Sequence, residues 1–151
     1  MYQRTLSLVA LSLAVTSTLA QKPPDKGGKG FKVSEGLEYT LWASEPLFVN
    51  PTCMDVDHKG RVWVCESVNY RNKLRNFKKL TRPEGDRIVI LEDEKGTGRA
   101  TKETTFYQSP EMMAPLGIAV VPSPKGKGVT VYVCQSPDIL VFEDFDGDGK
   151  A

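Results

Sequence analysis

The sequence predicts an all-β protein: a partial β-propeller of about two four-stranded antiparallel blades that follows an N-terminal signal peptide. From Phe31 onward there is no convincing helical period, and short β-branched and aromatic runs alternate with Gly, Pro and Asp turns. These runs recur in the same order in two successive copies. The first residues of the chain have the pattern of an export signal.

Residues 1–20 are predicted to be a secretory signal peptide. Arg4 supplies the positive charge, residues 6–15 are apolar except for two serines, and small residues precede the expected cleavage position. The apolar run is too short to cross a bilayer core of about 30 Å as a helix; an uncleaved anchor or a buried first helix is the alternative. Residues 21–30 contain no hydrophobic residue, which predicts a flexible linker. We therefore expect an exported protein (periplasmic, at the cell surface or secreted) that folds over residues 31–151.

Composition narrows the class of protein. The chain has 151 residues, with 20 Lys and Arg against 19 Asp and Glu, and 40% of its residues are hydrophobic. This composition excludes a wholly disordered chain, a collagen-like repeat and a multi-span membrane protein. Because charge is balanced and export is expected, no nucleic-acid partner is predicted.

The expected strands are short and separated by turns. Residues 69–80 are the one segment with any helical character, and they carry no clear apolar stripe. The strands are expected at residues 37–43, 52–57, 61–66, 87–92, 101–108, 117–121, 129–135 and 139–143.

An internal repeat relates the two halves of the folded region. Each copy has a strand opened by Pro, a turn, a strand with a Val-aromatic-Val pattern, a loop, and an apolar strand ending in Glu-Asp. A four-stranded antiparallel unit that repeats is typical of a propeller blade, and a closed propeller has about 4–8 blades. We therefore expect a domain truncated at its C-terminus; a β-sandwich with chance similarity is the alternative. The aligned segments are 51–57 with 115–121, 62–67 with 131–136, and 88–93 with 139–144.

Several motifs in order resemble a known family. Segments 31–38, 41–51, 57–66 and 86–93, with the final Asp-Gly-Asp-Gly-Lys-Ala, are similar to the N-terminal part of the planctomycete-type membrane-bound dehydrogenase domain family. The resemblance implies an exported β-propeller related to soluble quinoprotein sugar dehydrogenases, with pyrroloquinoline quinone as cofactor of the full-length parent. It also implies an electron-accepting cytochrome partner and membrane association of the parent. Haem c is expected only if a cytochrome domain lies downstream, since this chain has no Cys-x-x-Cys-His motif.

The function expected from this resemblance is that of an N-terminal fragment of a dehydrogenase that oxidises sugars or related alcohols. The fragment by itself is expected to be inactive. The alternative is a non-catalytic propeller that binds carbohydrate or protein at the cell surface. No residue is assigned as a catalytic base, and the only histidine, His58, is expected at an exposed turn.

An acidic loop near the end of the chain is a candidate Ca²⁺ site. Asp144, Asp146 and Asp148 alternate with residues that include glycines, a spacing that can wrap oxygen ligands around a hard cation. The alternative is a solvated acidic turn. In the earlier copy, Lys95 and Thr97 occupy the positions of the second and third Asp, so that turn is predicted to be structural only.

A long basic loop follows the strand at 61–66. Between Ser67 and Pro83 the chain has six basic residues and no acidic one, whereas the matching loop of the second copy is very short. Such an insertion is a candidate binding site for a small-molecule sugar or an anionic ligand, and a solvated surface loop is the alternative. Antiparallel alternation places it at the opposite end of the blades from the acidic loop. The residues named as candidate ligands are Tyr70, Arg71, Lys73 and Arg75.

The three cysteines leave two alternatives open. Cys53 and Cys65 flank a hairpin centred on residue 59, which makes them direct cross-strand neighbours and candidates for a strained disulfide. Cys65 and Cys134 occupy equivalent positions of the two copies, and they could instead be small buried core residues.

Overall fold

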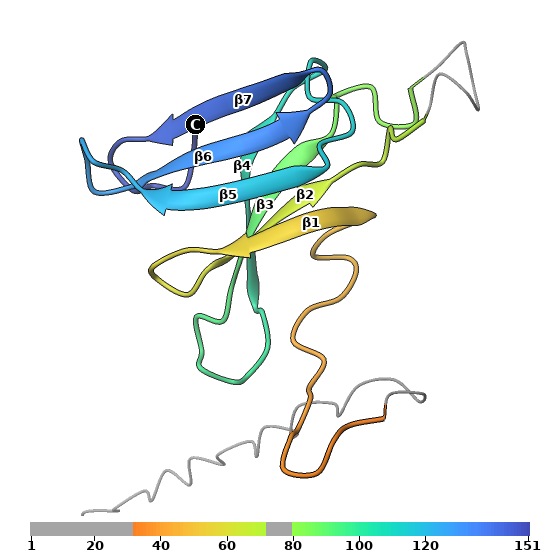
Figure 1. Cartoon of the computed structure of the whole chain (residues 1–151), viewed down its shortest axis with the longest axis vertical. Coiled ribbons are helices and arrows are strands. Elements are labelled where there is room, and N and C mark those ends of the chain that lie inside the picture. Colours follow the sequence, from red (N-terminus) through yellow and green to blue (C-terminus); the bar gives the residue numbers. More distant parts are fainter. Residues whose placement is uncertain (1–31, 72–79) are drawn as a thin grey trace, which may run out of the picture.

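The computed structural model describes residues 32–71 and 80–151, and in this part of the chain it shows seven β-strands and no helix. They form two antiparallel sheets, in the orders β1-β2-β3-β4 and β5-β6-β7 (Figure 1). The all-β prediction is confirmed, but the second of the two expected four-stranded units has three strands in the described residues. The predicted signal peptide (residues 1–20) and linker (residues 21–30) lie outside the described residues. The strands are β1 (Pro51–Val56), β2 (Val62–Glu66), β3 (Arg87–Glu92), β4 (Lys102–Gln108), β5 (Gly117–Pro122), β6 (Val129–Gln135) and β7 (Asp138–Asp144).

Seven of the eight expected strands coincide with β1–β7 to within a residue at each end. The prediction of a strand at residues 37–43 is wrong, because this segment is irregular and pairs with no strand. Trp42 and Ala43, at its end, instead pack against the cluster that Val64, Val89 and Leu91 form on the first sheet. The apolar residues at the end of this segment cover the sheet. A run of β-branched and aromatic residues occurs both in strands and in such covering segments, so the sequence does not distinguish the two. No helix in the described residues is long and apolar enough to cross a membrane.

The three strands β5–β7 of the second sheet repeat β1–β3 of the first, down to the strand register, and β4 has no counterpart among the described residues. In the first sheet Val56 pairs with Val62, which pairs with Leu91. In the second sheet the residues that the sequence repeat aligns with these three are paired in the same way: Val120 with Val131, and Val131 with Phe142. The residue before each opening proline also has the same left-handed backbone, with φ of 49° at Asn50 and 56° at Ala114. The repeat seen in the sequence is therefore a structural repeat.

Each sheet has two distinct faces, named here by their residues. The valine face of the first sheet contains Val56, Val62, Val64 and Leu91, and that of the second contains the equivalent Val120, Val131, Val133 and Phe142. The opposite face of the first sheet, the Trp63 face, contains Trp63, Cys65, Ile88 and Ile90, and its equivalent in the second sheet is the Tyr132 face, with Val121, Tyr132, Ile139 and Val141.

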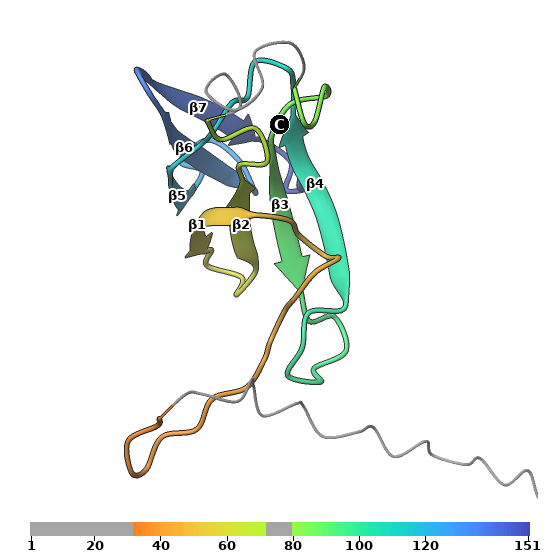
Figure 2. The same ribbon diagram turned by 90° about the vertical axis from the view of Figure 1, so that its right-hand side faces the viewer.

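The sheets pack head to tail. The Trp63 face of the first sheet and the valine face of the second form one buried cluster, so unlike faces meet. Figure 2 shows β5–β7 stacked beside the upper part of the first sheet. In a sandwich built from a duplicated unit, like faces would commonly meet across the core. Here the arrangement leaves the Tyr132 face of the second sheet uncovered, and Ile139 and Val141 are 68% and 55% exposed.

Aromatic rings join the two sheets. The rings of Trp63 and Phe106 meet edge to face with centroids 4.7 Å apart, and Phe142 of β7 lies 4.5 Å from Tyr107 of β4. Edge-to-face and tilted pairs are the favoured geometries of aromatic contacts. The indole nitrogen of Trp63 donates a hydrogen bond of 3.0 Å to the buried carboxylate of Asp57, which satisfies its polar atom. Trp63 is therefore both completely buried and fixed in orientation.

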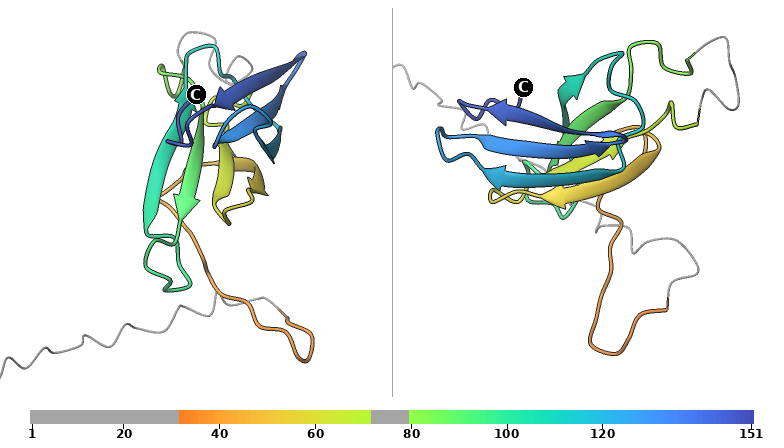
Figure 3. Two further views of the ribbon diagram at one scale, coloured as in Figure 1. Left: turned by 90° about the vertical axis from the view of Figure 1, so that its left-hand side faces the viewer. Right: turned by 45° about the horizontal axis from the view of Figure 1, so that its top comes forward.

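The first strands of the two sheets lie side by side, β1 next to β5 (Figure 3). The hydroxyl of Thr52 donates to the carbonyl of Pro115 at 2.6 Å, and the amide of Val120 donates to the Asp55 carboxylate at 2.7 Å. Ser67 also donates to the Pro115 carbonyl, at 2.8 Å. These polar contacts hold the two units together at the edge where their chains begin.

We predict that Trp63→Ala lowers the free energy of unfolding by about 3–5 kcal/mol, because it removes a buried aromatic side chain and leaves a cavity between the sheets. The control is Tyr132→Ala, the equivalent position of the second sheet, where the side chain is 43% exposed; here a loss below about 1 kcal/mol is expected. Urea unfolding of the full chain measures both. Equal losses at the two positions would contradict the head-to-tail arrangement.

Candidate functional site

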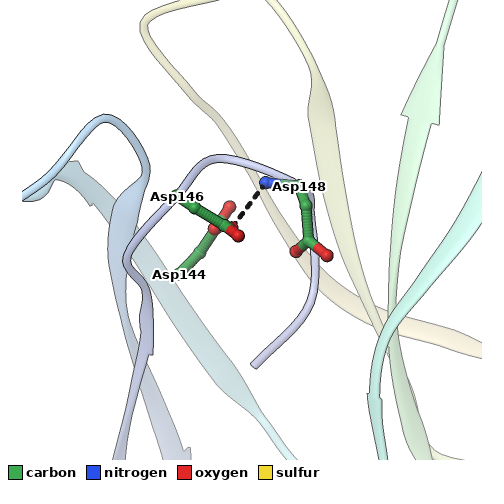
Figure 4. Close-up of side chains that lie close together, drawn as sticks. All are labelled: Asp144, Asp146 and Asp148. Atoms are coloured by element: carbon green, nitrogen blue, oxygen red, sulfur yellow. Dashed lines mark hydrogen bonds between the residues drawn. The ribbon is translucent and has the colours of Figure 1, made fainter.

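The acidic loop after β7 brings the three predicted carboxylates together. Asp144, Asp146 and Asp148 each place a carboxylate oxygen within 4.8 Å of the others (Figure 4). Asp144 is buried, whereas Asp146 and Asp148 are exposed. The Asp148 amide donates to the Asp146 carboxylate at 3.1 Å, which orients the two exposed carboxylates. The sequence prediction that these residues converge is thus met by the geometry, and the Ca²⁺ prediction itself remains to be tested.

Part of this loop has a purely structural role that both copies share. The Asp144 carboxylate accepts hydrogen bonds from the amides of Gly147 and Gly149, at 2.7 and 3.2 Å. In the earlier copy, Asp93 accepts from Gly98 at the same spacing, at 2.7 Å. Gly98 and Gly149 have φ of 76° and 82°, a left-handed backbone that glycine adopts without strain. The first Asp of each loop therefore holds the turn, and only Asp146 and Asp148 are peculiar to the second copy.

The donor set suits a hard cation, but its surroundings weaken the attraction. Three carboxylates supply oxygen ligands, and Ca²⁺ takes about 6–8 of them, so backbone carbonyls and water would have to complete the shell. Asp146 and Asp148 would hold such an ion at the surface, with Asp144 beneath them. The ammonium of Lys59 lies 3.5 Å from the position that a Cβ on Gly147 would occupy. Because this positive charge repels a cation, we expect the loop to bind Ca²⁺ only weakly.

The predicted basic site is described only at its first two residues. Tyr70 and Arg71 lie in the turn a few residues after the end of β2 and are exposed, and the Arg71 guanidinium lies over the Tyr70 ring at 5.2 Å. Lys73 and Arg75 lie outside the described residues. The acidic loop contacts the turn that precedes β2, near Lys59 and Arg61. The two candidate sites therefore lie at opposite ends of β2, as strand alternation predicts.

The base of the basic loop is closed by a buried asparagine. The side chain of Asn69 donates to the carbonyl of Arg82 at 2.9 Å and accepts from the Arg82 amide at 2.9 Å, in the manner of a paired strand. The backbone amide of Asn69 donates to one oxygen of the buried Asp86 carboxylate at 3.0 Å, and the backbone amide of Ala114 donates to the other oxygen at 2.8 Å. Asn69 and Arg82, at the two ends of the basic loop, are therefore held together.

A buried ion cluster lies beside this base, and the sequence analysis did not identify it. Glu66 is completely buried, and its carboxylate accepts two hydrogen bonds from the Arg87 guanidinium, at 2.8 and 3.0 Å, and another from Arg82. Arg87 also donates to Glu103 of β4, at 2.7 Å. The repeat contained a sign of this cluster: the first copy has a charged residue, Glu66, where the second has a neutral amide, Gln135.

Comparing Glu66 with Gln135 shows which contacts of Glu66 depend on its charge. The carboxylate of Glu66 accepts from the amide of Val49 at 2.9 Å, and Gln135 accepts from the equivalent amide, Met113, at 2.6 Å. Both side chains thus hold the segment before the opening proline, and only Glu66 has arginine partners. Burial raises the pKa of Glu66, but the hydrogen bonds from Arg87 and Arg82 outweigh it and lower the pKa below its ordinary value of 4.5.

Cys53 and Cys65 are direct partners in the register of β1 and β2, as the hairpin arithmetic predicts. Both are free thiols in this structure, as is Cys134, and Cys65 belongs to the buried core while Cys134 is exposed. The disulfide remains a prediction. His58 lies exposed in the turn between β1 and β2, where its position fits the reading of a surface residue.

One family model matches residues 23–151, a range that includes every described residue. The chain belongs to this family, a domain of unknown function (DUF7133). No curated protein and no solved structure shows a significant match to the chain.

We predict that Glu66→Gln lowers the free energy of unfolding at pH 7 by about 3–5 kcal/mol, because two arginines lose their buried partner. The folded-state pKa of Glu66 lies below its ordinary 4.5, so its stabilisation is present above that pH and is lost as the pH falls through the folded-state value. Between pH 7 and pH 3 the wild type should therefore lose more stability than the variant. Denaturant unfolding across this range measures the difference.

The control for this substitution is Glu94→Gln, which removes an exposed carboxylate bonded to Lys102 and should cost less than about 1 kcal/mol. If Glu66→Gln does not fold, Arg82→Gln tests the same cluster more gently, since Arg87 still neutralises Glu66. Parallel pH profiles for the wild type and Glu66→Gln would contradict the assignment of this stabilisation to Glu66.

Proposed function

We propose that this DUF7133 chain contributes two successive blades to an exported β-propeller of the quinoprotein-dehydrogenase type, which oxidises sugars or related alcohols. The observation that carries the proposal is the head-to-tail packing of two equivalent sheets. Each blade of a propeller presents one face to the preceding blade and the opposite face to the next, and here the valine face of the second sheet covers the Trp63 face of the first. The side-by-side contact of β1 and β5 fits the adjacent first strands of neighbouring blades.

The uncovered Tyr132 face supports the same proposal. It is equivalent to the Trp63 face, which a valine face buries, and it carries four exposed apolar side chains: Val121, Tyr132, Ile139 and Val141. Apolar patches of this kind mark surfaces that are buried in a partner. The occupant that fits is the valine face of a third sheet of the same repeat, because that is the surface that covers the equivalent face within this chain.

The two candidate ligand sites lie at opposite loop ends of these blades, and each has a proposed role. Arg71, with Tyr70 beside it, is exposed at the end of β2 and could pair with carboxylates of pyrroloquinoline quinone or with an acidic sugar. The quinone, when bound, accepts the electrons removed from the sugar. Asp146 and Asp148 would hold a Ca²⁺ ion at the opposite end of the blades. An electron-accepting cytochrome would be the redox partner of the parent.

The test is a dye-reduction assay on the intact gene product, with pyrroloquinoline quinone and Ca²⁺ added, across a panel of sugars and alcohols. We expect quinone-dependent oxidation of at least one substrate. We also expect Arg71→Ala to weaken quinone binding by about tenfold, the loss of one charge-assisted hydrogen bond. The matched control is Lys125→Ala, an exposed basic residue in the turn that leads into β6, which should leave binding unchanged.

The Ca²⁺ arm compares equivalent loops. Asp146→Asn and Asp148→Asn should each reduce the Ca²⁺-dependent rise in melting temperature, whereas Glu94→Gln and Lys95→Gln, in the loop of the first copy, should not. Binding of a carbohydrate without dye reduction would favour the alternative, a non-catalytic binding module at the cell surface. Neither oxidation nor carbohydrate binding by the intact protein would contradict both functions.

A further inference from the structure

Two cysteines of the first sheet face each other across β1 and β2 at a separation that a disulfide can span. Cys53 of β1 pairs with Cys65 of β2 in the register that runs on to Val56 with Val62, and a register shift lies on the other side, between Pro51 and Cys53. The amide of Asp57 donates to the carbonyl of Arg61 at 3.0 Å, which fixes the alternation of the ladder and makes the cysteines a hydrogen-bonded pair. Such pairs have Cα atoms about 5.5 Å apart, within the range of about 4.4–6.8 Å that a disulfide spans.

The two thiols are chemically unequal. Cys53 is only partly buried, and its sulfur accepts a hydrogen bond of 3.9 Å from the Thr52 hydroxyl. The facing Cys65 thiol, as a hydrogen-bond donor to the Cys53 sulfur, is the main cause that lowers the pKa of Cys53 to about 7. Cys65 is completely buried, and its pKa is raised, first by the hydrogen bond to Cys53 and then by burial. Cys53 packs against the buried core but is the more exposed of the two thiols, so it is the expected nucleophile, while Cys65 stays protonated.

The second sheet provides an internal comparison. Cys134 is equivalent to Cys65, but its cross-strand partner is Gly117, which occupies the position of Cys53. A Cβ added to Gly117 would lie only 3.3 Å from the Cys134 sulfur. A side chain at position 117 would therefore crowd Cys134, whereas the first sheet holds two facing cysteine side chains at the equivalent positions. The cysteine pair is a property of the first unit and is not required by the fold.

We propose that Cys53 and Cys65 form a reactive dithiol site that reduces small disulfide compounds and in doing so closes to a cross-strand disulfide. The site is independent of the proposed dehydrogenase function. The co-reactant is a low-molecular-weight disulfide such as glutathione disulfide.

The reaction has two exchange steps. The Cys53 thiolate attacks one sulfur of the small disulfide, its S–S bond breaks, and the released thiolate takes up the proton that Cys53 lost. The hydrogen bond and the negative charge that raised the pKa of Cys65 then disappear, since Cys53 is now a mixed disulfide. The Cys65 thiolate attacks the Cys53 sulfur, and the second small thiol leaves with the proton of Cys65. Two protein thiols are oxidised and one disulfide is reduced to two thiols.

The test treats the reduced full chain with glutathione disulfide, quenches it with acid and locates the products by mass spectrometry of peptides. The wild type and Cys134→Ser should both give a Cys53–Cys65 disulfide with no glutathione left on Cys53. Cys65→Ser should stop at a glutathione adduct on Cys53, and Cys53→Ser should leave Cys65 unmodified. Glutathione that accumulates on Cys134 while Cys53 and Cys65 stay free would overturn the proposal.

A second measurement uses the wild-type chain and needs no substitution at Cys53 or Cys65. The rate of iodoacetamide alkylation of Cys53 in the wild-type chain should reach half its maximum near pH 7, against about pH 8.5 for a cysteine peptide. Because nucleophilicity falls as the pKa falls, the expected advantage of Cys53 over the peptide at pH 7 is only about threefold. A midpoint at the peptide value would show that Cys65 does not support the Cys53 thiolate, and the proposal would fail.

Discussion

The contact between the Trp63 face of the first sheet and the valine face of the second is the constraint on which the rest of the structure depends. Neither unit could bury both of its apolar faces alone, because each is a single sheet. Stacking buries the Trp63 face completely, and Asp57 fixes the indole that lies at its centre. The polar contacts between β1 and β5 then follow from that stacking, since they lie along the edge where the two units meet.

Much of this fold could be predicted from the sequence, because the repeat carries register information. Aligning Val62 with Val131 fixes which residues of each unit are equivalent, and the strand pairs obey that alignment. The faces that meet could not be predicted, since alternation along a strand separates two faces without saying which neighbour covers each. Residues 37–43 do not form the predicted strand for a related reason: an apolar run that covers a sheet and one that joins it have the same composition.

The candidate sites divide in the same way. The convergence of Asp144, Asp146 and Asp148 follows from local spacing, and so does the pairing of Cys53 with Cys65. The cluster around Glu66 joins residues far apart in the sequence, and only the folded chain brings Arg82 and Arg87 onto one carboxylate. Both carboxylate oxygens of Asp144 accept backbone amides, whereas Asp146 and Asp148 each accept one amide and are exposed, which leaves oxygen atoms of these two residues for a ligand.

The measurement that tests the head-to-tail arrangement most directly is the set of nuclear Overhauser contacts of the Trp63 indole ring in the full chain. The account predicts contacts from this ring and from Phe106 to the methyl groups of Val131 and Val133, and none to Tyr132 or Val141. Contacts between Trp63 and Tyr132 would mean that like faces meet, as in a symmetric sandwich. That result would contradict the stacking of two successive equivalent sheets.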